Sequence, residues 1–152
     1  MKPILLMTVL LSCAGASLAT HAAAPAAASA SAPAAFAGQD YSGVYDCTGD
    51  DSKEGKYTAT VTLALQPAHS VGRDGSYSLK MEVPGYGTYL GHVVANDTMA
   101  ALHFALTDPK PHDFGTGLAS ISKTGGKTRF HKFYYEPEFK GGNHGTEDCI
   151  KR

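Results

Sequence analysis

The chain has 152 residues, of which 43% are hydrophobic, and its 13 basic and 14 acidic residues give a formal net charge of −1. This length suffices for one folded domain. Because the charges are balanced and no basic run is present, the sequence excludes the electrostatic footprint of a nucleic-acid-binding protein.

The first 22 residues have the pattern of a secretory signal peptide. Lys2 supplies a positive charge, residues 3–11 form a short apolar run, and small residues follow at once. A membrane-spanning helix needs about 20 consecutive apolar residues, so this run predicts cleavage rather than a membrane span. We therefore expect export to the periplasm or the extracellular space. Residues 10–13 offer an alternative, because they resemble a lipobox in which Cys13 would be lipidated and tether the protein to the outer membrane.

Residues 23–39 consist almost entirely of Ala, Pro and Ser until Phe36. A segment of this composition cannot build a core of its own, which predicts a disordered tether. The folded domain is then expected over residues 40–152.

Alternation of apolar and polar residues runs through most of this domain. It is clearest in residues 57–65, 77–83 and 100–106, and a first strand is expected at residues 43–47. Gly-, Pro- and Asn-containing turns separate the runs, and no window keeps a helical period. The spacing predicts an all-β domain, a single antiparallel up-and-down meander of about eight strands that closes into a small barrel.

The cysteines support this topology. Apart from Cys13, the chain contains only Cys47 and Cys149, near opposite ends of the expected domain. Two such cysteines in an exported protein predict a disulfide. In an up-and-down barrel the first and last strands must pair, so the bond would join the closing strands. Neither cysteine lies in a Cys-x-x-Cys spacing, and we predict no metal site and no cofactor.

Several short segments carry a family resemblance. Residues 43–49, 57–65, 75–79, 115–119 and 141–147 together resemble small, secreted, calycin-like (lipocalin-like) bacterial barrels. No Trp follows Gly43, whereas the Gly-x-Trp motif of true lipocalins would place one there. The resemblance implies a small secreted barrel.

No segment has a catalytic or metal-binding signature. Residues 49–56 depart from the spacing of both a P-loop and a calcium loop, which indicates a solvated hairpin loop. His92 and His103 could meet across a hairpin, but two ligands without a third favour solvent-facing histidines.

No serine stands in a Gly-x-Ser-x-Gly elbow, so nucleophilic catalysis has no signature. The carboxylates that could be paired for acid–base work, at Glu136, Glu138, Glu147 and Asp148, lie near strand ends and are expected to be solvated. We therefore predict a protein that is not an enzyme.

Residues 129–139 are unusual because both faces of the expected strand carry aromatics. Phe130 and Tyr134 share the face that can fill the barrel, and Phe133 and Tyr135 share the other, which we expect Arg129 and Lys132 to flank. The outer pair is covered by the tether, packs against the loop at residues 108–115 or binds a partner.

These observations predict a monomeric, noncatalytic binding module. A small apolar ligand would bind in the interior, and a protein partner would bind the aromatic strand at Phe133, Tyr134 and Tyr135. The interior is expected to be lined by Tyr45, Val61, Leu63, Leu79, Met81 and Phe104. The alternative is an inhibitor of an extracellular or periplasmic enzyme, acting through Tyr86 and Tyr89 in an exposed loop at residues 84–89.

Overall fold

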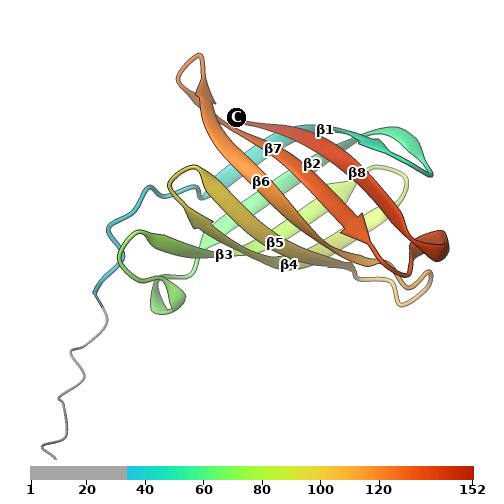
Figure 1. Ribbon diagram of the computed structural model, residues 1–152, viewed down its shortest axis with the longest axis horizontal. Coiled ribbons are helices and arrows are strands. Elements are labelled where there is room, and N and C mark those ends of the chain that lie inside the picture. Colours follow the sequence, from blue (N-terminus) through green and yellow to red (C-terminus); the bar gives the residue numbers. More distant parts are fainter. Residues whose placement is uncertain (1–33) are drawn as a thin grey trace, which may run out of the picture. The chain divides into compact units, whose positions relative to one another are not determined.

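The computed structural model describes residues 34–152, in which eight antiparallel strands form one closed barrel (Figure 1). Each strand pairs with its neighbours in chain order, and the last strand pairs with the first. The strands are β1 (Gly43–Asp51), β2 (Gly55–Leu65), β3 (Asp74–Val83), β4 (Gly87–Asn96), β5 (Met99–Leu106), β6 (Phe114–Thr124), β7 (Lys127–Glu136) and β8 (Asn143–Lys151). Two single-turn 3₁₀ helices are present, η1 (Pro67–His69) and η2 (Phe139–Gly141). The predicted all-β meander barrel is confirmed, and β1 runs four residues beyond the expected strand end.

Alternation along the strands decides which side chains fill the barrel. In β5, Phe104 is buried whereas its neighbour His103 is exposed, and the same period of two holds on β3 around Leu79. Successive side chains of a strand point to opposite faces, so every second residue enters the core. The core is built from residues of all eight strands and from Tyr41, which precedes β1.

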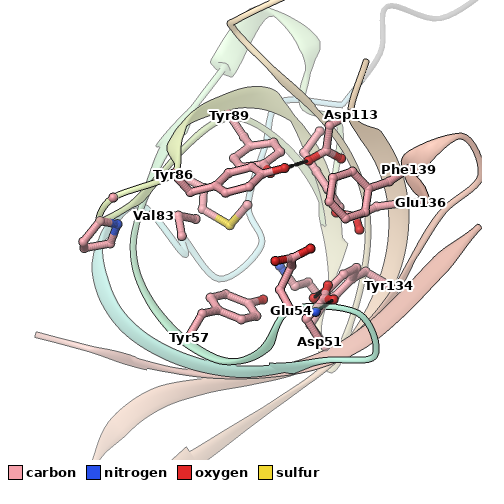
Figure 2. A pocket seen from close by; sticks show the side chains of 15 residues that line it. Asp51, Glu54, Tyr57, Val83, Tyr86, Tyr89, Asp113, Tyr134, Glu136 and Phe139 are labelled. Atoms are coloured by element: carbon pink, nitrogen blue, oxygen red, sulfur yellow. Dashed lines mark hydrogen bonds between the residues drawn. The ribbon is translucent and has the colours of Figure 1, made fainter. Parts of the chain in front are cut away.

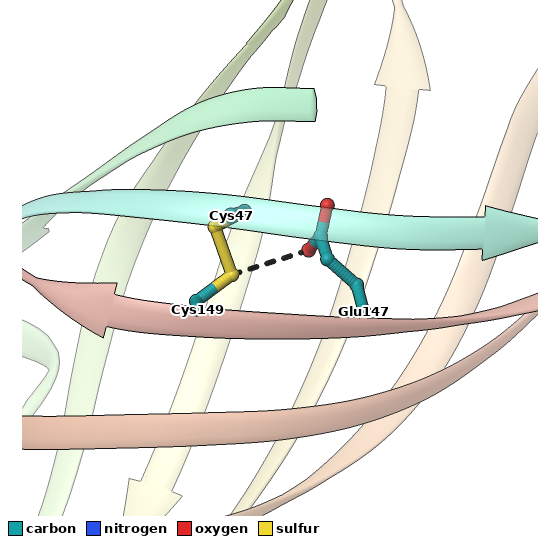
Figure 3. A group of neighbouring side chains, drawn as sticks. All are labelled: Cys47, Glu147 and Cys149. Atoms are coloured by element: carbon teal, nitrogen blue, oxygen red, sulfur yellow. Dashed lines mark hydrogen bonds between the residues drawn. A yellow bond between two sulfur atoms is a disulfide. The ribbon is translucent and has the colours of Figure 1, made fainter. Parts of the chain in front are cut away.

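The disulfide joins β1 to β8, as predicted. Cys47 and Cys149 lie directly opposite each other in the register of the two strands and are bonded to one another (Figure 3). The buried carboxylate of Glu147 lies beside the bond, with Oε2 at 3.4 Å from the Sγ atom of Cys149.

One rim of the barrel is closed by the chain that leads into β1. Tyr41 is buried against Phe130, with ring centroids 5.9 Å apart, and its amide donates a hydrogen bond to the hydroxyl of Tyr77. The amide of Ala37 donates to the carbonyl of Gly72, at 2.7 Å. The segment before β1 therefore folds against this rim.

The opposite rim carries the β1–β2, β3–β4, β5–β6 and β7–β8 connections. In a meander, alternate connections lie at the same end, so these four segments surround one opening (Figure 1). In the described part of the chain, no helix is long and apolar enough to cross a membrane.

We expect replacement of Cys47 and Cys149 by Ala to lower the free energy of unfolding by about 4–5 kcal/mol, because the bond closes a loop of 102 residues. Urea unfolding of the double variant and the wild type measures this difference. A wild type whose unfolding midpoint does not respond to a reducing agent would contradict it.

Candidate functional site

A cavity of about 260 Å³ opens at the rim formed by these four connections (Figure 2). Side chains from both the strands and the connections line it. They are Asp51, Glu54, Tyr57, Met81, Val83, Pro84, Tyr86, Tyr89, Phe104, Asp113, Lys132, Tyr134, Glu136 and Phe139, together with Gly85.

Aromatic rings form much of the cavity wall. The ring of Tyr86 stacks on that of Tyr89, with centroids 6.2 Å apart and planes 2° from parallel. Phe139, on η2, meets Tyr86 edge-on at 6.4 Å, and Phe104 meets both Tyr89 and Tyr134 edge-on at 5.7 and 5.9 Å. Such contacts between rings fix their orientation as well as bury area.

Asp113 lies in the wall between Tyr89 and Phe139 (Figure 2) and is only 4% exposed. Its Oδ2 atom accepts hydrogen bonds from the hydroxyls of Tyr89 at 2.5 Å and Tyr86 at 3.3 Å. Burial and the negative charge of Asp113 raise the pKa of Tyr86 to about 12, so the phenol stays a donor. The buried Oδ1 atom has no hydrogen-bond partner among the described residues.

A second polar group joins β1, β7 and β8, the strands that follow β6 around the barrel. The amide of Asn143, which is 1% exposed, donates to Oδ2 of Asp51 at 2.7 Å and also to Oε2 of Glu136. The hydroxyl of Tyr134 donates to Asp51 at 2.8 Å. Because each end of this network comes from a different strand, it fixes the cavity wall across the barrel seam.

The two carboxyls in this network have opposite pKa shifts. Burial opposes ionisation of Asp51, but hydrogen bonds from Asn143, from the backbone and from Tyr134 hold its pKa below the ordinary value. Burial, followed by the charges of Asp113 and Asp51, raises the pKa of Glu136 to about 7, against smaller opposing effects of Asn143 and Lys132.

Lys132, which lines the cavity, belongs to a buried ion pair. Nζ of Lys132 lies 2.5 Å from Oε2 of Glu147, and these side chains are 7% and 1% exposed. The ammonium also lies 5.5 and 5.2 Å from the ring centres of Phe104 and Tyr134, and the hydroxyl of Tyr57 donates to Glu147 at 3.1 Å. Such pairing is what a buried charge requires, and it leaves Lys132 without surplus charge for the cavity.

The predicted interior residues are divided between two places. Met81 and Phe104 line the open cavity, whereas Tyr45, Val61, Leu63 and Leu79 line a separate void of about 40 Å³ deeper in the barrel. The void has room for one or two water molecules. The interior near Tyr45 is therefore filled by protein, and space for a ligand is concentrated at the open rim. Tyr134, which was expected to bind a protein partner together with Phe133 and Tyr135, lines the cavity instead and is 3% exposed.

The outer aromatics lie on an exposed apolar row. Phe133 is 52% and Tyr135 is 47% exposed, and Phe133 pairs in register with Leu118, which is 60% exposed. The row continues through Ala101 to Val94 on β5 and β4. The described residues leave this row exposed, so the loop at residues 108–115, one of the alternatives for the outer pair, does not cover it.

Several sequence-based placements are corrected by the position of side chains in the alternation. Lys132 was expected beside Phe133 on the outer face, but it shares the inward positions of Phe130 and Tyr134. Glu136 and Glu147 were expected to be solvated and are 6% and 1% exposed. Glu138 is exposed, as expected, and Asp148 is half-buried in pairs with Arg129 and His131.

The hairpin loop at residues 49–56 is shorter than expected. β1 continues to Asp51, whose buried carboxylate accepts the backbone N–H groups of Lys53 and Glu54. Lys53 and Glu54 are exposed, as expected of a solvated turn, but Asp51 and Glu54 both line the cavity.

His92 and His103 meet across the β4–β5 hairpin, with 3.2 Å between ring nitrogens, and both are exposed. Within residues 34–152, the sole group of three possible ligands within 4.8 Å of one another is Cys47, Glu147 and Cys149. Both sulfurs of that group are used in the disulfide, so the group cannot bind a metal as it stands. Cys13, the predicted lipidation site, lies outside the described residues.

No family model, no curated protein and no solved structure matches this chain. The arrangement of the cavity therefore provides the evidence for function.

We expect the stability of the protein to fall as the pH rises, because Glu136 has a higher pKa in the folded state than in the unfolded chain. The folded state holds the proton of Glu136 more tightly, so this stabilisation is complete below pH 4.5 and is lost as the pH rises through about 7. A shift of this size corresponds to about 3 kcal/mol at most.

Urea unfolding between pH 4.5 and about 7 should show a smaller loss of unfolding free energy in Glu136→Gln than in the wild type. Glu82→Gln, which changes an exposed carboxyl paired with Lys80, serves as the control and should behave as the wild type does. Equal pH dependence in the wild type and Glu136→Gln would contradict the assignment.

Proposed function

We propose that this protein is a noncatalytic binding protein that takes a small amphipathic molecule into the cavity at the open rim of the barrel. The observation that carries the proposal is the cavity itself, which combines aromatic walls with a few buried polar groups. Ligand sites are commonly mostly apolar, with a small number of polar groups that orient the ligand.

The volume favours a small ligand. Pockets for drug-sized molecules usually measure about 300–1,000 Å³, and this cavity lies just below that range. Because Asp51, Asp113 and Glu136 face the cavity, the ligand should carry a polar group as well as the apolar body expected from the sequence.

The geometry gives less support to the inhibitor alternative. Tyr86 and Tyr89, which were expected to present an inhibitory loop, both belong to the cavity wall and bond to Asp113. Tyr89 is only 5% exposed. The loop at residues 84–89 therefore fits better as part of the mouth of a binding site than as a probe inserted into an enzyme.

We also propose export, on the basis of the signal-like residues 1–22, which lie outside the described residues. The Cys47–Cys149 bond supports an oxidising compartment. The closed eight-stranded barrel agrees with the resemblance to calycin-like proteins, which we retain as part of this proposal.

A second candidate function is recognition of a protein partner on the outer row of Val94, Ala101, Leu118 and Phe133. Contiguous exposed apolar side chains are typical of interaction sites. A partner bound there would be released by Leu118→Ser or Phe133→Ser and retained when a cavity residue is replaced.

Binding can be tested with indole, a small amphipathic probe. The chain contains no Trp, so indole fluorescence excited at the red edge of the tyrosine band reports the probe alone. We expect saturable binding of indole to the wild type. In Val83→Phe we expect the affinity to fall at least tenfold, because the phenyl ring introduced at this partly buried wall position would occupy the cavity.

Leu90→Phe is the matched control, since Leu90 is 52% exposed on the outer face of β4. It should bind indole as the wild type does. Equal loss in both variants would place the probe elsewhere and contradict the proposed site.

A further inference from the structure

We propose that the ligand of the cavity is an organic cation, an amine with an aromatic or apolar body, whose ammonium group binds beside the carboxylate of Asp113. The inference rests on the proposed binding function and names the ligand class. Its basis is a buried carboxylate whose hydrogen-bonding capacity is half used.

Asp113 is the first observation. Oδ2 accepts two phenolic hydrogens, from Tyr86 and Tyr89, whereas Oδ1 is buried without a donor. A buried carboxylate normally has all of its oxygens satisfied by donors or a cation. An ammonium group beside this carboxyl would supply the opposing charge, and it would supply the missing donor once the carboxyl turns Oδ1 toward the cavity.

The balance of charge around the cavity also favours a cationic ligand. Lys132 is the one cation among the described residues that line it, and Lys132 is already paired with Glu147. Four carboxylates line the cavity, and one of them, Glu54, pairs with Lys140. Asp51 and Asp113 have no cationic partner among the described residues, and Glu136 adds a further negative charge when it ionises. An anionic ligand would be repelled, and a neutral ligand would leave this charge uncompensated.

The aromatic wall suits the same class of ligand. The faces and edges of Tyr86, Tyr89 and Phe139 surround the position of Asp113 (Figure 2). A cation near such ring faces is attracted by their quadrupoles, and the apolar body of the ligand gains contact area on the same rings.

A metal ion fits less well than an organic cation. Among the described residues, Asp51, Asp113 and Glu136 do not form a group whose ligand atoms lie within 4.8 Å of one another. A single hard ion would need several oxygens converging on it. A molecule several atoms long can instead place its ammonium at Asp113 and its body toward Val83 and Met81.

Three indoles of similar size distinguish the ligand classes, namely indole, tryptamine and indole-3-acetate. Each is titrated into the full mature protein, and the affinity is read from indole fluorescence. We expect tryptamine to bind about ten- to a hundredfold more tightly than indole, as a charge-assisted hydrogen bond provides, and indole-3-acetate to bind most weakly.

Asp113→Asn keeps the shape of the side chain and removes its charge. We expect it to abolish the preference for tryptamine over indole. Asp50→Asn is the control, because Asp50 is exposed, pairs with Lys56 and does not line the cavity. It should retain the wild-type preference.

The wild-type comparison needs no variant, so a folding defect in Asp113→Asn does not weaken the test. Binding of indole with no preference for tryptamine would overturn the cation proposal and leave the binding function intact. Failure of all three probes to bind would overturn both.

Discussion

The pairing of β1 with β8 is the contact on which the rest of this structure depends. It removes both free edges of the sheet, and Cys47 and Cys149 fix it covalently in register. Once the sheet is closed, each strand position is committed either to the interior or to solvent. A slip of one residue would turn every side chain of a strand to the opposite face, exposing Tyr45 and burying Asp46.

The two halves of the barrel interior are filled by different kinds of side chain. Toward the rim near Tyr41, tyrosine, phenylalanine and aliphatic side chains fill the interior and leave a void of about 40 Å³. Toward the other rim, polar side chains replace apolar ones, and they are held by mutual hydrogen bonds because water is excluded around them. The interior of an eight-stranded barrel is just wide enough either to be filled by side chains or to hold one small ligand. A few polar residues therefore suffice to turn a packed core into a site.

The sequence predicted the barrel and its disulfide because alternation and cysteine spacing are local signals that closure must satisfy. The same alternation contained most of the missed site. Asp51 lies four residues after Cys47, Lys132 lies between Phe130 and Tyr134, and Glu147 precedes Cys149 by two, so all three occupy inward positions. Charged residues were expected in solvent because of their residue type. On a strand, however, the position in the alternation decides whether a side chain points inward or outward. Asp113 precedes β6 in a loop, and the cavity is the volume that side chains leave empty. Neither follows from a period of two.

Both ends of the folded chain leave the barrel at the closed rim. Tyr45 pairs with Lys151 there, and the amide of Arg152 donates to the carbonyl of Val44. The cavity opens at the far end of the same strands. An attachment at either end of the domain, whether an anchor, a surface for immobilisation or a fused reporter, would therefore orient the mouth away from the point of attachment and toward the surrounding solution.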